Sequence, residues 1–268
     1  MQRKRFAVIQ VAVMLLVAAL QAHAGTLEAA KQRGALIVGV RKDFPPLGYI
    51  DGTGQLVGFE VDLARYLARH LLGDEGKLQV QRVQAGDRIT SLLSGSIDML
   101  IAGVMVTDYS ASVFAFSEPY LMSGSLLLVR RGSSISDFPD VVGKKVAVIE
   151  GSVQEGVQEG VLGPAIQGVT LVKFWSVSAA VEALRTGQVD AFAEDDVLVW
   201  ALARQYPQLA AVGNQFRPPH PVAVAVRKDD QELLAWVNGQ LQNAKADGTY
   251  DTLWKRYFGE GGPIPIRP

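Results

Sequence analysis

The chain has 268 residues, with 26 Lys and Arg against 27 Asp and Glu, and therefore a net charge of −1. This balance gives no bulk electrostatic attraction to nucleic acid or to an anionic membrane, so any recognition of charge must be local. The chain contains no cysteine, which excludes disulfides, and its length is sufficient for one large domain or two smaller ones.

Residues 1–24 have the pattern of a secretory signal peptide. Basic residues precede an apolar run over 6–20, and the segment ends on the small residues Ala22 and Ala24. We expect cleavage after Ala24, because the apolar run is shorter than the ~20 residues of a membrane-spanning helix. A lipid-anchored form would need an N-terminal cysteine, so the sequence predicts a soluble protein of a Gram-negative periplasm.

After this segment, apolar runs bounded by Gly and Pro alternate with stretches of helical period, which is typical of βαβ construction. We expect strands at 36–40, 78–82, 99–102, 126–130, 145–149, 170–173, 191–193 and 222–226. Helical spacing is found at 61–71, 89–93, 178–184 and 198–205. The last segment, 231–257, is amphipathic, and Gly248 is expected to divide it into two helices.

A short internal repeat indicates how these elements are grouped. Residues 93–99 resemble residues 185–191, and each copy has a helix end, a glycine and then Asp98 or Asp190 before a buried strand. The repeat favours two similarly built α/β lobes. Chance similarity of a common helix-to-strand turn is the alternative.

Four motifs follow one another along the chain. They are GALIVGVRKDFPP at 34–46, GFEVDLA at 58–64, FSEPY at 116–120, and DGTY at 247–250 followed by Trp254, Tyr257 and Phe258. In number and order they resemble the periplasmic solute-binding proteins of the polar amino-acid group, which are bacterial extracellular solute-binding proteins of family 3. The resemblance covers almost all of the chain after residue 24.

This resemblance implies an α/β fold of the type II periplasmic-binding kind, with two lobes joined by two crossing strands. Lobe 1 would comprise residues 25–120 and 222–268, and lobe 2 with the hinge strands would comprise 121–221. A ligand that contacts both lobes favours the closed form, which an ABC permease and its ATPase would then recognise. We expect a monomeric binding protein without cofactor, metal or nucleic acid, and not an enzyme.

The expected ligand cleft departs from the family pattern at one turn. Relatives have a T-x-x-R turn whose arginine pairs with the ligand's α-carboxylate, whereas Ser110 follows Thr107 here, and Met105 stands where many relatives have threonine. A charge-assisted pair of that kind contributes about 1.5–3 kcal/mol. Either other cations replace the arginine, or the ligand carries no standard α-carboxylate at this point.

Two arginines and two carboxylates are the charged candidates for the cleft. Arg88, at a helix start, and Arg41, after the first strand, match basic positions of acidic-amino-acid binders. A salt bridge or a solvated position is the alternative for each. Asp195 matches the aspartate that pairs with the ligand's ammonium, or else it is the N-cap of the next helix, and Glu194 adds a second carboxylate.

The remaining candidates are uncharged. Ser152 follows a strand and is expected to open a helix, so it could receive an anion or simply cap that helix. Phe44 and Tyr120 would supply apolar walls or core packing, and Gly103 would let the backbone approach the ligand closely.

We therefore expect the binding subunit of an ABC importer for an acidic or atypical amino acid or a related small polar metabolite. One alternative is a periplasmic enzyme on the same fold, such as a cyclohexadienyl-type dehydratase, with Glu194 or Glu150 as acid or base. Another is a ligand-sensing module. His70 and His220 stand apart, and the chain has neither metal-ligand spacing nor a phosphate-binding glycine motif.

Overall fold

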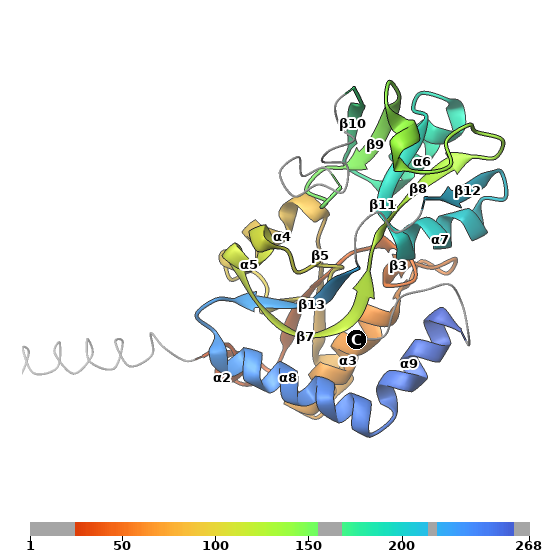
Figure 1. The fold of residues 1–268 in the computed structure, drawn as a ribbon. Helices are drawn as coiled ribbons and strands as arrows, with labels where there is room; N and C mark the ends of the chain where they lie inside the picture. Colours follow the sequence, from red (N-terminus) through yellow and green to blue (C-terminus); the bar gives the residue numbers. More distant parts are fainter. Residues whose placement is uncertain (1–24, 155–167, 214–218, 260–268) are drawn as a thin grey trace, which may run out of the picture.

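The computed structural model describes residues 25–154, 168–213 and 219–259, so the expected signal peptide lies outside the described residues. The fold is two-lobed and α/β, as predicted. Figure 1 shows the two lobes one above the other, with strand β7 (Phe114–Ser123) running on into β8 (Ser125–Arg130) between them.

Lobe 1 is built on a five-stranded sheet of order β5-β1-β6-β13-β7. β1 pairs in parallel with β5 and β6, whereas β13 is antiparallel to β6 and β7. The other strands of this sheet are β1 (Leu36–Val40), β5 (Leu78–Arg82), β6 (Met99–Leu100) and β13 (His220–Arg227). A small antiparallel sheet beside it contains β2 (Asp43–Phe44), β3 (Gly48–Ile50) and β4 (Leu56–Val57).

Six α-helices of the described chain belong to lobe 1. They are α2 (Thr26–Arg33), α3 (Phe59–Leu72), α4 (Arg88–Leu93), α5 (Asp108–Val113), α8 (Gln231–Ala246) and α9 (Thr249–Phe258). The two helices at the C-terminal end of the described chain, α8 and α9, pack below the five-stranded sheet (Figure 1). Gly248, in the left-handed conformation, separates α8 from α9, as the sequence predicts. Lobe 1 therefore contains both early and late parts of the chain.

Lobe 2 repeats the design with a sheet of order β10-β9-β11-β8-β12. β9 pairs in parallel with β10 and β11, and β8 runs antiparallel to β11 and β12. Its elements are β9 (Lys145–Ile149), β10 (Thr170–Phe174), β11 (Ala191–Asp195), β12 (Leu209–Val212), α6 (Val177–Thr186) and α7 (Asp196–Gln205).

The internal repeat has a structural reason. In lobe 1, the Asp98 carboxylate accepts a hydrogen bond from Ile37 N at 2.8 Å, and Asp98 N donates to Ile37 O at 2.8 Å. In lobe 2, Asp190 makes the same pair of bonds with Lys145 N at 2.9 Å and Lys145 O at 2.8 Å. Each aspartate thus ties the turn after a helix to a strand of its own sheet, β1 in lobe 1 and β9 in lobe 2, and satisfies backbone groups there.

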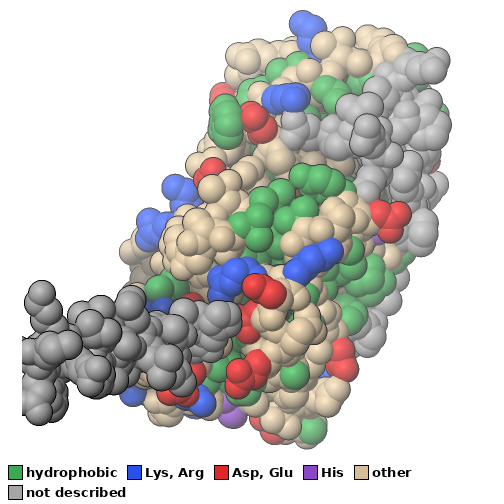
Figure 2. Space-filling model, turned by 90° about the vertical axis from the view of Figure 1, so that its left-hand side faces the viewer, with side chains coloured by type: hydrophobic (Ala, Val, Ile, Leu, Met, Phe, Trp, Pro, Cys, Tyr) green, Lys and Arg blue, Asp and Glu red, His purple; other side chains and the backbone are tan. Residues whose placement is uncertain are grey.

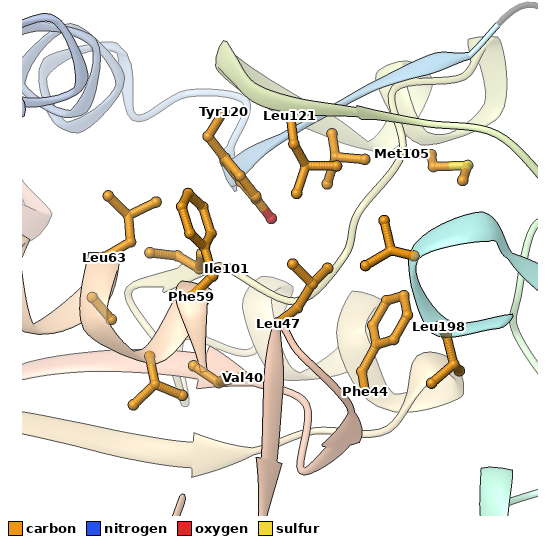
Figure 3. Packing of buried hydrophobic residues seen from close by; sticks show 14 of the residues in the cluster. Val40, Phe44, Leu47, Phe59, Leu63, Ile101, Met105, Tyr120, Leu121 and Leu198 are labelled. Atoms are coloured by element: carbon orange, nitrogen blue, oxygen red, sulfur yellow. The ribbon is translucent and has the colours of Figure 1, made fainter. Parts of the chain in front are cut away.

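An aromatic cluster joins the C-terminal helix to the body of lobe 1. The Phe59 ring, at the start of α3, lies 5.8 Å from Tyr250, 6.2 Å from Trp254 and 5.3 Å from Phe258, measured between ring centroids. Figure 3 shows Phe59 beside Tyr120 within the buried apolar cluster. Aromatic pairs of this kind contribute about 0.5–1.5 kcal/mol each beyond area burial, so the late motif residues have a packing role.

The surface in Figure 2 carries basic and acidic side chains interspersed with apolar ones, in keeping with the near-zero net charge. Within the described ranges, no helix has the length and apolarity needed to cross a membrane.

Candidate ligand-binding cleft

The two lobes touch each other across the cleft. Gly151, after β9, has φ +77, and a Cβ there would lie 2.7 Å from the backbone N of Gly86 in lobe 1. At a second contact, Val177 N at the start of α6 donates to the Asp43 carboxylate of lobe 1 at 3.5 Å. The structure therefore shows a closed arrangement in which charged residues of both lobes meet.

Arg41, immediately after β1, lies at the centre of these charges and is buried. Its Nε donates to Asp43 Oδ1 at 3.1 Å, and one terminal nitrogen lies 3.6 Å from Glu194 Oε1 across the cleft. The guanidinium also stacks on the Phe44 ring at 4.4 Å from the ring centroid. Burial opposes the charge, but the neighbouring Asp43 and Glu194 hold the pKa of Arg41 above its usual value.

Arg88, at the first position of α4, is held by backbone carbonyls. It donates to Ala85 O at 3.0 Å, Ala102 O at 3.2 Å and Gly103 O at 3.3 Å, all in lobe 1. A fourth bond, to Gly151 O at 3.1 Å, crosses to lobe 2. Burial and the nearby Arg41 charge lower the pKa of Arg88 to about 10, so it remains cationic at neutral pH and links the lobes.

Glu60 brings a carboxylate to the same region from the first turn of α3. Its Oε1 accepts from Gly103 N at 2.7 Å and from the Tyr120 hydroxyl. Gly103 has φ +59, and a Cβ there would lie 2.4 Å from the Phe44 ring, so only glycine fits against that ring. Burial raises the pKa of Glu60, and burial beside Glu60 raises the pKa of the Tyr120 hydroxyl.

Lobe 2 contributes Glu194 and Asp195 from the end of β11, and both are buried. Gln154 Nε2 donates to Asp195 Oδ1 at 2.8 Å and to Ser125 Oγ at 2.9 Å. Burial, with the neighbouring Glu194 charge, raises the pKa of Asp195 well above its usual value, and burial also raises the pKa of Glu194. These carboxylates are therefore poised to gain from a positive charge.

Asp195 occupies the N-cap position of α7, but its side chain makes no capping hydrogen bond. Its neighbour Asp196 makes that bond instead, accepting from Val197 N at 2.7 Å. Asp196 also accepts from Ser123 Oγ at 2.6 Å and from Gly124 N at 3.1 Å at the strand crossing. The helix start and the hinge thus depend on Asp196, and the Asp195 carboxylate does not cap the helix.

The backbone N and the hydroxyl of Ser110 are both hydrogen-bonded within its own turn. Its backbone N donates to Thr107 Oγ1 at 3.1 Å, while its hydroxyl accepts from Thr107 N at 2.9 Å and donates to Met105 O at 2.8 Å. This reciprocal arrangement is a capping box at the start of α5. Met105 itself is buried in the apolar cluster that also contains Phe44 and Leu198, the latter on α7 (Figure 3).

Of the ten residues singled out in the sequence, the structure brings six into one interlobe group: Arg41, Phe44, Arg88, Gly103, Glu194 and Asp195. Tyr120 reaches this group through Glu60. Met105 packs in the apolar cluster that contains Phe44, and Ser110 is bonded to Met105 O, so these two residues are together called the wall at Met105 and Ser110. Ser152 lies in a turn after β9, and the helix expected to follow falls on residues 155–167, outside the described residues.

Two functional candidates were missed by sequence reasoning. Glu60 lies inside the quoted GFEVDLA motif, which by itself predicts only the start of a helix. Gln154 follows Ser152 by two positions, and a glutamine in a turn gives no sequence signal of a buried contact with a carboxylate 41 residues later.

A cavity of about 350 Å³ lies at the rim of the cleft and is lined from both lobes. Its lining includes Lys42, Asp43 and Arg82 of lobe 1 and Trp175, Ser176 and Ser178 of lobe 2. Asp43 also contacts Arg41, so this cavity adjoins the buried charges.

Residues 36–260 match the family of bacterial extracellular solute-binding proteins, family 3. The chain belongs to this family. It is 30% identical over 238 residues to the ABC transporter glutamine-binding protein GlnH of Bacillus subtilis, covering 88% of this chain and 85% of the relative. It is 32% identical over 241 residues to the L-cystine-binding protein TcyJ of Escherichia coli, covering 89% and 88%.

Solved structures give the same result. A mutant of ArgBP from T. maritima superposes with a TM-score of 0.81 at 33% identity, covering 88% of this chain and 100% of that one. The ancestral amino-acid-binding protein AncCDT-1, described as a precursor of cyclohexadienyl dehydratase, has a TM-score of 0.78 at 31% identity, covering 87% and 99%. The family is thus one of amino-acid-binding proteins, and its members differ in the amino acid for which they are named.

Proposed function

We propose that the chain is the periplasmic solute-binding subunit of an ABC importer and that it closes its lobes around an amino acid or a related small polar metabolite. The observation that carries this proposal is the buried group of opposite charges assembled from both lobes. Arg41 and Glu60 come from lobe 1, and Glu194 and Asp195 come from lobe 2. Buried ionic groups are costly unless they are paired, so such a group favours a charged or zwitterionic guest.

The proposed roles follow from the contacts. Asp195 and Glu194 would receive a cationic nitrogen of the ligand, because burial has made their ionised forms costly and a positive charge would offset that cost. Phe44 would form an apolar wall below the stacked Arg41 guanidinium, and Met105 would extend that apolar surface.

Closure would be a population shift. A ligand that contacts both lobes binds the closed form more tightly than the open one and thereby increases its population. The bond from Arg88 to Gly151 O joins the lobes in this arrangement. The names of the relatives support delivery to an ABC permease and ATPase, and the predicted signal peptide supports a periplasmic location.

The test is a thermal-shift screen of the mature protein with amino acids, amines and organic acids, followed by calorimetric titration of each hit. At least one compound is expected to raise the melting temperature, because ligand binding to the folded state stabilises it by mass action. A small-angle scattering measurement should show a compact form when that ligand is added. If no compound in the three classes binds, the proposed function is wrong.

An enzymatic role is the second candidate, favoured by AncCDT-1 as a structural neighbour and by the raised pKa values of the buried carboxylates Glu194 and Asp195. Relatives named as binding proteins favour simple binding. Incubation with cyclohexadienyl acids, followed by NMR, should leave the substrates unchanged, whereas turnover lost in Glu194→Gln would establish the enzyme.

A further inference from the structure

Three buried polar atoms around the interlobe charges accept no hydrogen bond within the described part of the chain. They are Glu60 Oε2, Glu194 Oε2 and Gln154 Oε1. Glu60 is 0% exposed, and Glu194 and Gln154 are each 1% exposed, so bulk water does not reach these side chains. All three atoms are acceptors, and an unsatisfied buried acceptor costs about 1–3 kcal/mol, or more when it is charged. The described protein therefore leaves these three acceptors without the hydrogen-bond donors that they need.

The same residues belong to one electrostatic group. Glu60 and Glu194 both interact with the charges of Arg41 and Arg88, and Gln154 binds Asp195, which adjoins Glu194. The unsatisfied acceptors thus come from α3 of lobe 1, from β11 of lobe 2 and from the turn after β9. A ligand between the lobes would lie next to all three.

Carboxyl groups outnumber guanidiniums in this group. Glu60, Glu194 and Asp195 are three buried carboxyl groups, and Asp43 adds a fourth at the edge, against the two guanidiniums of Arg41 and Arg88. Arg88 already donates to four backbone carbonyls. Arg41 is paired with Asp43 and Glu194 and stacked on Phe44. Both cations are therefore engaged with protein groups, and the acceptors outnumber them.

The wall at Met105 and Ser110 offers no compensating cation. The Ser110 hydroxyl and amide are used in the capping box, and the hydroxyl donates its proton to Met105 O rather than outward. An anionic group placed against this wall would meet a closed turn and an apolar side chain, and a desolvated anion without a partner is costly.

We infer that the ligand is a small cation rich in N–H donors, a primary amine or guanidine, that carries no α-carboxylate. This inference rests on the proposed function and specifies its ligand class. An ammonium has three donors and a guanidinium has five, which suits acceptors that lie on both lobes. Charge-assisted bonds of this kind are about twice as strong as neutral ones, so the cation would hold the two lobes together.

Calorimetric titration of matched pairs tests the inference, each pair being an amino acid and its decarboxylated amine. The probes are L-arginine with agmatine, L-lysine with cadaverine and L-ornithine with putrescine. In at least one pair the amine should bind about ten-fold or more tightly than its parent, the equivalent of one lost charge-assisted contact. Tighter or equal binding of the parents, or binding of acidic or neutral amino acids alone, would overturn the inference while leaving the proposed function intact. If no compound of the wider metabolite screen binds either, both the inference and the proposed function are wrong.

Two isosteric variants locate the acceptors. Glu60→Gln and Glu194→Gln keep the side-chain volume and remove one charge each, and each should weaken the binding amine about ten-fold or more. Glu182→Gln, an exposed carboxylate on α6 that pairs with Arg185, is the matched control and should leave affinity unchanged. Thermal melts verify that each variant folds. If Glu60→Gln does not fold, the test rests on Glu194→Gln alone. An affinity for the amine equal to that of the wild type would then exclude the buried acceptors as the binding site.

Discussion

The starts of helices α5 and α7 differ in how their polar side chains are used. At α5, Thr107 and Ser110 satisfy each other and the backbone, and Ser110 makes its bonds inside its own turn. At α7, Asp196 caps the helix, so Asp195 at the N-cap position has a carboxylate that does not cap it. Polar groups that are satisfied by their own turn stabilise the fold, whereas a buried carboxylate released from that task can bind a ligand.

The largest expected effect separates the two neighbouring aspartates of the α7 start. Asp195→Asn should weaken ligand binding by about 100-fold, or about 3 kcal/mol, because it removes a buried charge that pairs with the ligand. Its effect on the melting temperature should be small. Asp196→Asn should instead lower the melting temperature, since Asp196 accepts from Ser123, Gly124 and Val197. Calorimetric titration and thermal melts of both variants check this, and reversed effects would invalidate the comparison.

A second pair of variants tests the contact between the lobes. Gly151→Ala would place a Cβ 2.7 Å from the Gly86 backbone, so it should hinder closure and weaken ligand binding about ten-fold. Gly187→Ala is the matched control, because its φ of +79 is similar and no atom lies within 4 Å of the added Cβ. Both substitutions should cost about 1–2 kcal/mol of folding stability through left-handed backbone strain. Equal affinities in the two variants would show that Gly151 has no part in closure.

A smaller effect concerns pH. Burial raises the pKa of Asp195 and Glu194 above the ordinary carboxyl value of about 4, with Arg41, Arg88, Asp43 and Asp196 as the charged groups around them. Protonation therefore stabilises the folded unliganded protein at low pH, and this stability is lost as pH rises through the raised values.

The melting temperature of the unliganded wild type should accordingly fall relative to that of Asp195→Asn as pH rises through this window. Over the same range, affinity for a cation should increase, because the ligand binds the ionised carboxylates. Melting curves and titrations at a series of pH values measure both trends. A wild type that gains stability over Asp195→Asn with rising pH would contradict the account.

Most of the fold could be predicted from the sequence because its strands are short apolar runs bounded by turns. β1, β5 and β9 have the predicted bounds. The ten-residue strand β7 was not predicted, since Ser117, Glu118 and Pro119 interrupt its apolar pattern. β7 is at the edge of the sheet, and its pairing with β13 shifts near Ala223, opposite Pro119. An edge strand with such irregularities tolerates a proline that a central strand would not.

The position of a candidate residue was predictable where it stands next to a predicted strand, as Arg41, Glu194 and Asp195 do. Their role in ligand binding remains a prediction. Sequence could not show that Arg88 is held by carbonyls of both lobes, because those partners are backbone atoms brought together by tertiary folding. It also could not choose between capping and ligand binding for Asp195, since the choice depends on which of two adjacent aspartates points at the helix amides.

The central claim is that the cleft selects a cation without an α-carboxylate. The reason is that Ser110 bonds within its own turn and offers no positive charge to a carboxylate. The most direct measurement is calorimetric titration of wild type and Ser110→Arg with agmatine and L-arginine. The account predicts that wild type prefers agmatine and that Ser110→Arg shifts the preference toward L-arginine by about ten-fold or more, because the new guanidinium repels the amine and pairs with a carboxylate. Tighter binding of L-arginine by the wild type, with no change in Ser110→Arg, would contradict it.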